Sequence, residues 1–223
     1  MSPRSHADEP VDQQPVRRVA CIGDSITCGH GLKDPKREAY PAQLQEILGG
    51  DYEVRAFCMS GTTLLRKGAK SIWATNEWKL AQAYGADVAI VQLGTNDTKE
   101  ADWRQHRGEF VDDCKSLIRS LREKNPAVDV FVCLPPPLFR DRGKPWDTDA
   151  ILAKEIVPKL RRVAADENAT LINVYSACDS HSSDFSDGVH PNAAASKLIA
   201  ETISAAIDAR RQEKKSEQDA KGK

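Results

Sequence analysis

The chain has 223 residues, of which 40% are hydrophobic and 29% charged, with a formal net charge of −1. This length suits one α/β domain with a substantial core. The charge lacks the basic excess of nucleic-acid-binding proteins, and no apolar run approaches the roughly 20 residues of a membrane span. Residues 1–17 contain no apolar signal-peptide core. We therefore expect a flexible segment at 1–17 and a soluble protein, either secreted or periplasmic after removal of a signal peptide or else cytoplasmic.

Short apolar runs alternate with longer amphipathic ones, which is typical of strands followed by helices. The expected elements, in chain order, are a strand at 18–23, a helix at 40–48, a strand at 52–57, a helix at 73–84, a strand at 87–93, a helix at 103–124, a strand at 128–134, a helix at 148–167, a strand at 170–174 and a helix at 191–214. Pro158 should kink or split its helix. The charged tail at 215–223 is expected to be disordered. The alternation predicts one three-layer α/β/α domain at 18–214, with a five-stranded parallel sheet.

Small and polar residues follow four of the five predicted strands, which is where ligands bind in such sheets. The four blocks are Gly23-Asp24-Ser25, Ser60-Gly61, Gly94-Thr95-Asn96-Asp97 and Asp187-Gly188-Val189-His190. They supply a serine, an asparagine and an Asp/His pair. Because the carboxyl ends of parallel strands meet at one edge of the sheet, these groups are candidates for a single site.

Each block also has a purely structural interpretation. Asp187 and His190 are close enough in sequence for a tight turn to bring the carboxylate onto the imidazole and hold it in one tautomer, as in an acid–base pair. Pro191 restrains the backbone of His190. The alternative is a helix-start loop in which Asp187 caps and His190 is exposed. Asn96 is either an amide donor to an oxyanion or a turn residue. Gly61 either offers a free backbone N–H to a tetrahedral centre or is a turn residue.

The stretch Cys21–Gly31 begins in the first predicted strand and places three glycines around a serine. Its spacing matches neither the phosphate-binding loop, G-x-x-x-x-G-K-[ST], nor the dinucleotide fingerprint, G-x-G-x-x-G. The nucleophile elbow, G-x-S-x-G, is absent as well. Ser25 is therefore either a nucleophile with distant partners or part of a bare turn. His30 is near enough in sequence to line a pocket, although a surface position is expected.

Taken together, the four blocks resemble the GDSL or SGNH hydrolase superfamily of serine esterases and lipases, in the same order and over roughly residues 18 to 210. The resemblance implies a flavodoxin-like fold in which the first strand lies between the second and the third. It implies catalytic residues Ser25, Asp187 and His190 and an oxyanion hole of Ser25, Gly61 and Asn96, with no metal and no cofactor. The stretch 56–61 departs from the Asn-x-Gly-x-Ser-Gly of many relatives, which leaves the pocket shape open.

The opening block and the segment Leu64-Leu65-Arg66-Lys67-Gly68 look like those of carbohydrate esterases that remove acetyl groups from sialic acid or plant polysaccharides. The resemblance thus implies hydrolysis of short-chain acetyl esters on a carbohydrate such as sialic acid or xylan, through an acyl-enzyme. Arg66, Trp73 and Trp146 are candidate sugar contacts, because aromatic rings stack on sugars and guanidinium groups pair with carboxylates. The alternative for Trp73 is a packing role in a helix.

Other functions stay open at this point. The same residues could serve a lysophospholipase-, thioesterase- or acyltransferase-like activity. A carbohydrate-binding protein without catalysis is the remaining alternative, although no member of the triad is missing. The expected partner is a small-molecule or oligosaccharide ester, with no nucleic acid and no membrane span, and nothing in the sequence indicates the oligomeric state.

The six cysteines lack the spacing of a metal site. Cys21, Cys114 and Cys133 lie in apolar segments and are expected to be buried free thiols. Cys28 and Cys58 lie on loops that could approach each other. A disulfide between them therefore stays open, and so does the compartment.

Overall fold

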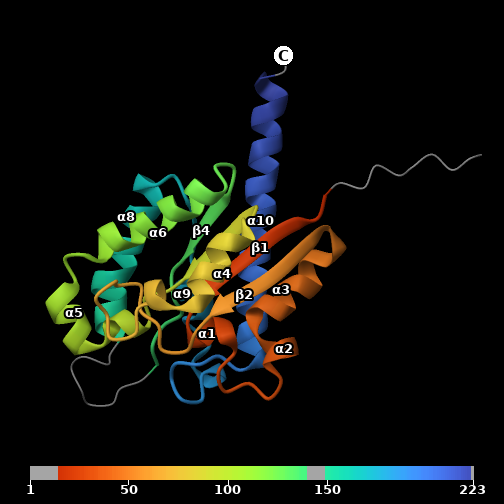
Figure 1. Cartoon of the computed structure of the whole chain (residues 1–223). Coiled ribbons are helices and arrows are strands. Elements are labelled where there is room, and N and C mark those ends of the chain that lie inside the picture. Colours follow the sequence, from red (N-terminus) through yellow and green to blue (C-terminus); the bar gives the residue numbers. More distant parts are fainter. Residues whose placement is uncertain (1–14, 140–148, 222–223) are drawn as a thin grey trace, which may run out of the picture.

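The computed structural model describes residues 15–139 and 149–221. Its centre is one sheet of five parallel strands in the order β2-β1-β3-β4-β5 (Figure 1). The strands are β1 (Arg17–Gly23), β2 (Tyr52–Cys58), β3 (Val88–Gln92), β4 (Asp129–Cys133) and β5 (Thr170–Ile172). This confirms the predicted parallel sheet, with the first strand between the second and the third.

Helices cover both faces of the sheet, which gives the three predicted layers. One face packs against α4 (Asn76–Tyr84), α6 (Phe110–Lys124) and α8 (Val157–Asp166). The other packs against α3 (Tyr40–Leu48), α9 (Val174–Cys178) and α10 (Ala193–Lys221). The shorter helices are α1 (Ser25–Cys28), α2 (Pro35–Glu38), α5 (Glu100–His106) and α7 (Asp149–Ile151).

β1 illustrates how the sequence builds two cores. Its residues from Val19 to Ile22 are all fully buried. Ala20 and Ile22 belong to the core beneath α4, α6 and α8, whereas Val19 and Cys21 belong to the core beneath α3 and α10. Successive side chains of a strand point to opposite faces, so a strand covered on both sides needs an uninterrupted apolar run.

The helix predicted at 103–124 is wrong in its continuity, because α5 ends at His106 and α6 begins at Phe110. Gly108 lies in the break, and glycine disfavours a helix interior by about 1 kcal/mol relative to alanine. Trp103 and Phe110 pack edge to face across the break, with ring centroids 5.4 Å apart. Tertiary packing therefore stabilises two shorter helices here.

Local chemistry sets the bounds of two other predicted helices. The helix predicted from residue 73 begins at Asn76, because the Thr75 hydroxyl accepts a hydrogen bond from the Trp78 backbone N–H at 3.1 Å. Pro158 interrupts the helix predicted at 148–167, as expected: a π-helical stretch at Leu152–Ile156 separates α7 from α8. Proline has no N–H to donate to the preceding turn, and a wider turn accommodates this loss.

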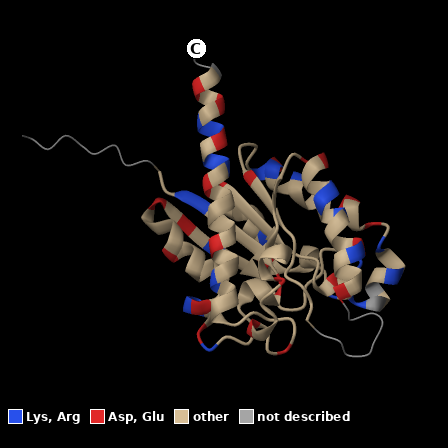
Figure 2. Ribbon diagram, turned by 180° about the vertical axis from the view of Figure 1, so that it is seen from behind, with Lys and Arg blue, Asp and Glu red and all other residues tan. Residues whose placement is uncertain are grey.

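α10 contradicts the predicted disorder of the charged tail, because it continues to Lys221 and its last turns stand clear of the body in Figures 1 and 2. The tail is rich in Gln, Glu and Lys, which are good helix formers. Arg210 and Lys214, one turn apart, also approach the Asp129 carboxylate at 3.8 and 2.5 Å. These ion pairs hold α10 against the start of β4 and favour its extension.

Most of the predicted flexible segment, 1–17, lies outside the described residues. Its last residue, Arg17, instead belongs to β1: it is paired with Tyr52 of β2, and its guanidinium donates to Asp129 at 3.3 Å. These partners explain why the strand starts one residue earlier than predicted. Within the described part of the chain, no helix combines the length and the apolar character that crossing a membrane requires.

Candidate active site

Ser25 follows β1 directly and opens the short helix α1. Its neighbour Asp24 caps this helix, because the carboxylate accepts a hydrogen bond from the Ile26 backbone N–H at 2.9 Å. Gly23 leaves no room for a side chain, since a Cβ there would lie 2.0 Å from the Thr27 hydroxyl oxygen. This sharp exit from β1 holds Ser25 at the carboxyl edge of the sheet with 7% of the residue exposed.

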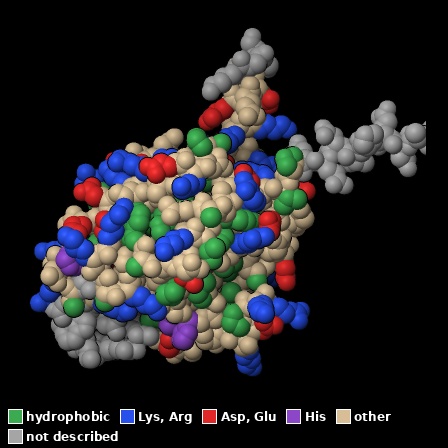
Figure 3. Space-filling model, in the orientation of Figure 1, with side chains coloured by type: hydrophobic (Ala, Val, Ile, Leu, Met, Phe, Trp, Pro, Cys, Tyr) green, Lys and Arg blue, Asp and Glu red, His purple; other side chains and the backbone are tan. Residues whose placement is uncertain are grey.

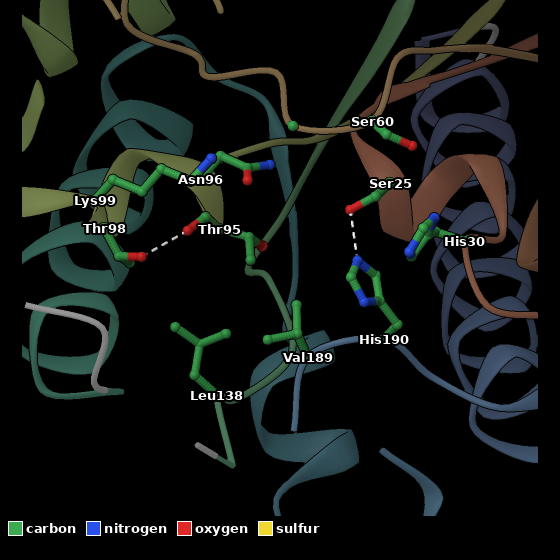
Figure 4. Close-up of a pocket in the computed structure, with 11 residues that line it drawn as sticks. Ser25, His30, Ser60, Thr95, Asn96, Thr98, Lys99, Leu138, Val189 and His190 are labelled. Atoms are coloured by element: carbon green, nitrogen blue, oxygen red, sulfur yellow. Dashed lines mark hydrogen bonds between the residues drawn. The ribbon is translucent and has the colours of Figure 1, made fainter. Parts of the chain in front are cut away.

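The side chains of Asp187, His190 and Ser25 form a continuous hydrogen-bonded line. Nε2 of His190 lies 2.8 Å from Ser25 Oγ (Figure 4), and Nδ1 lies 2.6 Å from Asp187 Oδ2. The second carboxylate oxygen, Oδ1, accepts from the backbone N–H groups of Val189 and His190 at 2.9 and 2.8 Å. The tight turn expected from the sequence is therefore present, and Gly188 takes a φ of +76° within it.

These contacts keep Asp187 ionised and His190 oriented. Partial burial raises the pKa of the Asp187 carboxyl, but the hydrogen bonds from His190 and Val189 outweigh it and hold the pKa well below its usual range. A carboxylate that accepts from Nδ1–H leaves Nε2 as the acceptor for a hydroxyl proton. Only 17% of the His190 side chain is exposed, so the alternative of an exposed histidine beside a helix cap does not describe this turn.

Gly61 and Asn96 line the same pocket as Ser25, on the loops that follow β2 and β3. Gly61 takes a φ of +84°, a conformation that favours glycine. The amide nitrogen of Asn96 donates to the Thr62 carbonyl at 3.1 Å and to Asp24 Oδ2 at 3.2 Å. Figure 4 shows this amide nitrogen on the side of Asn96 that faces Ser25.

A disulfide between Cys28 and Cys58 answers a question that the sequence left open, with Cα atoms 5.6 Å apart. It joins the end of α1 to the end of β2, and the Met59 backbone N–H also donates to the Gly23 carbonyl at 3.3 Å. The stretch 56–61, which departs from the pattern of many relatives, thus contains a half-cystine that ties it to the Ser25 helix.

Asp97, on the turn after β3, is hydrogen-bonded to the loop after β2. Its carboxylate accepts from the backbone N–H groups of Leu64 and Leu65 at 3.0 and 2.9 Å. Asp97 is fully buried, so these bonds are shielded from water. The turn after β3 and the loop after β2 are therefore held in a fixed relation around Gly61 and Asn96.

The loops enclose a pocket of about 350 Å³. Apart from Leu138 and Val189, the described side chains that line it are polar or charged. In Figure 3, histidine side chains are exposed at the left and lower edges of the face shown. The arrangement offers a hydroxyl with an adjacent base and a space for a small polar ester. The lining residues are Ser25, His30, Ser60, Gly61, Thr95, Asn96, Thr98, Lys99, Leu138, Val189 and His190.

Comparison with known proteins identifies the family. The model of the GDSL-like lipase/acylhydrolase family matches residues 21–198, which include all four blocks. The chain belongs to the GDSL-like lipase/acylhydrolase family.

Relatives of this GDSL-like chain include an acetylxylan esterase from Xylanibacter ruminicola, 35% identical over 217 residues that cover 89% of this chain and 44% of that protein. The chain thus spans less than half the length of that relative. Two solved structures share the fold. The carbohydrate acetylesterase Est24 from Sinorhizobium meliloti has a TM-score of 0.69 and 24% identity, and the aryl esterase of M. smegmatis has 0.71 and 21%; each match covers 86% of this chain and 99% of the other.

Several residues that line the pocket of this GDSL-like chain were not predicted to do so from the sequence, or were expected elsewhere. His30 was expected on the surface; it is exposed, yet it also lines the pocket, and its ring centroid lies 4.5 Å from that of His190. Val189 lies within the block at 187–190, and Lys99 lies just after the block at 94–97. Their position next to a strand exit could therefore have placed both residues at the pocket. Leu138 follows β4, the one exit whose proline run gave no chemical indication.

Two of the three candidate sugar contacts, Arg66 and Trp73, are not among the residues that line this pocket. Arg66 stacks on Trp73, with its guanidinium carbon 3.6 Å from the ring centroid, and pairs with Asp113 of α6 at 3.4 Å. The Trp73 indole N–H donates to the Leu64 carbonyl at 3.0 Å. These partners place Arg66 and Trp73 outside the pocket lining. Trp146 lies outside the described residues.

Asp24 is a buried carboxyl beside the site. Burial raises its pKa to about 7, and the charge of Asp97 also raises it, whereas the hydrogen bonds from Ile26 and Asn96 lower it.

Among the described residues, no group of three or more His, Cys, Asp or Glu side chains could hold a metal ion.

Proposed function

We propose that this chain is an acetylesterase that removes O-acetyl groups from a carbohydrate such as xylan. The observation that carries the proposal is the hydrogen-bonded line from Asp187 through His190 to Ser25, which ends in a pocket of about 350 Å³. The Xylanibacter ruminicola relative is an acetylxylan esterase, and this favours xylan over sialic acid as the carbohydrate.

Ser25 is the nucleophile of the proposed reaction. Its Oγ attacks the ester carbonyl carbon while Nε2 of His190 takes the hydroxyl proton, and Asp187 stabilises the imidazolium that forms. The sugar alcohol leaves with the proton that His190 returns, and an acetyl group remains on Ser25. His190 then takes a proton from water, which attacks the acetyl-enzyme; acetate leaves, and Ser25 Oγ regains its proton.

Three donors stabilise the oxyanion that develops in both steps: the backbone N–H groups of Ser25 and Gly61 and the side-chain amide of Asn96. One such donor is worth about 10²–10³ in turnover. Thr62 and Asp24 hold the Asn96 amide before the substrate arrives. A donor held in this way needs little reorganisation as charge develops.

A short acyl group suits this pocket better than a fatty acyl chain. The pocket volume is about 350 Å³, and among the described lining residues only Leu138 and Val189 contribute apolar side chains. A long acyl chain would need a continuous apolar channel to gain free energy from burial. We therefore expect kcat/KM for p-nitrophenyl acetate to exceed that for the octanoate.

Replacing Ser25 by alanine tests the assignment. We expect Ser25→Ala to lower acetate release from acetylated xylan and from p-nitrophenyl acetate by at least about 10³-fold, because the nucleophile is lost. The matched control is Ser216→Ala at the exposed end of α10, which should keep wild-type turnover. Circular dichroism checks that both variants fold. Wild-type turnover in a folded Ser25→Ala protein would refute the proposal.

A further inference from the structure

Lys99 is a cation on the wall of the active-site pocket. It follows the turn that carries Asn96, its side chain is exposed, and in Figure 4 it extends along the Asn96 side of the pocket. No ion pair of Lys99 occurs among the described residues. Neighbouring basic side chains differ in this respect, because Lys67 lies 3.0 Å from Glu109 and Arg66 lies 3.4 Å from Asp113.

Lys70 adds a second cation at the opposite loop. Its ammonium donates to the Ser60 carbonyl at 2.7 Å, and a Cβ placed on Gly61 would lie 3.6 Å from Lys70 Cδ. Lys70 is exposed and also has no carboxylate partner among the described residues. The rim thus carries one ammonium beside the Gly61 corner and one beside Asn96.

No aspartate or glutamate appears among the described residues that line this pocket. The nearby carboxyls are engaged elsewhere: Asp97 by Leu64 and Leu65, and Asp187 by His190. The charge of Lys99 also lowers the pKa of buried Asp24, so its field reaches the end of the pocket that holds Asn96. Among the described residues that line the pocket, no carboxylate lies beside this positive charge.

We propose that Lys99, with Lys70, binds a carboxylate on the alcohol part of the substrate, so that the preferred esters are O-acetyl groups on saccharides that carry a uronic acid. This inference rests on the proposed esterase function and specifies its substrate class. A carboxylate gains a charge-assisted hydrogen bond from an ammonium that has no other anionic partner. A neutral sugar has no carboxylate to accept this bond. The enzyme should therefore have a higher kcat/KM for the acetyl ester of a uronic acid than for that of a neutral sugar.

The test uses two mono-O-acetylated methyl glycosides that differ only at C6, a glucuronoside and a glucoside. For the 223-residue wild-type chain we expect kcat/KM for the glucuronoside to exceed that for the glucoside by about tenfold, the size of one hydrogen bond to a charged group. Lys99→Gln should bring this ratio close to 1, mainly through KM. The matched control, Lys79→Gln, removes the same charge from the exposed face of α4 and should keep the wild-type ratio.

The dependence on ionic strength is a second test. The wild-type ratio of kcat/KM between glucuronoside and glucoside should fall as salt screens the attraction between the ammonium and the carboxylate. A wild-type ratio near 1, or a ratio that survives Lys99→Gln, would overturn the inference while leaving the esterase proposal intact. Equal losses on both glycosides in Lys99→Gln would also overturn it and would assign Lys99 to stabilisation of the oxyanion. Absence of acetate release from either glycoside and from acetylated xylan would count against the esterase function itself.

Discussion

Asp24 shows at the scale of a single residue how the site is organised around buried polar groups. One carboxylate oxygen caps the helix of Ser25, and the other accepts from the amide of Asn96 at 3.2 Å. The residue is 1% exposed, so water contributes little to its solvation. A single side chain thus positions both Ser25, the proposed nucleophile, and Asn96, a proposed oxyanion donor. The burial that makes these bonds effective also disfavours the ionised form of Asp24.

This environment predicts a pH dependence of stability. Burial raises the pKa of Asp24 to about 7, whereas an unfolded aspartate ionises near about 3.9. Between these values the folded protein holds a proton that the unfolded chain has lost, so stability falls as pH rises through this window. The free energy of unfolding of wild type relative to Asp24→Asn should fall by about 1.4 kcal/mol per pH unit there. Urea unfolding at several pH values measures it, and parallel curves for the two proteins would contradict it.

Chain elements show which features the sequence could predict. The apolar run of β3 predicted a strand buried on both faces, and this is what the structure has. The break between α5 and α6 was missed because amphipathic periodicity continues through Gly108 and only tertiary packing reveals the division. The extension of α10 was missed because its ion pairs with Asp129 join residues about 80 positions apart.

The Cys28–Cys58 disulfide gives a prediction at the same scale. It connects α1 to the end of β2 across a sequence separation of 30, so its loss should destabilise the protein by about 3 kcal/mol. Because Ser60 and Gly61 lie just beyond Cys58, with Met59 between, kcat should fall as well when Cys28→Ser and Cys58→Ser are combined. Reductant should lower the melting temperature of wild type and leave that of the double variant unchanged. A wild-type protein insensitive to reductant would contradict this role.

For the whole molecule, strand order explains how distant residues form one site. β1 lies between β2 and β3, so the exits that carry Ser25, Gly61 and Asn96 are neighbours, and the loop with His190 meets them from a position 165 residues beyond Ser25. The sequence could predict these residues because each block is short and local. It could not predict that Arg66 pairs with Asp113 of α6 and stacks on Trp73, or that Lys99 borders the pocket, since loop paths depend on packing between elements.

In the proposed mechanism Ser25 carries the acetyl group during turnover, and this intermediate can be trapped. Acid quenching during the first turnovers of p-nitrophenyl acetate, followed by mass spectrometry, should find one acetyl group per chain on the peptide that contains Ser25. Ser25→Ala should show no such adduct, and a burst of p-nitrophenol in wild type should match the amount trapped. An acetyl group on another residue, or turnover of wild type with no adduct and no burst under conditions where deacylation limits the rate, would contradict the account.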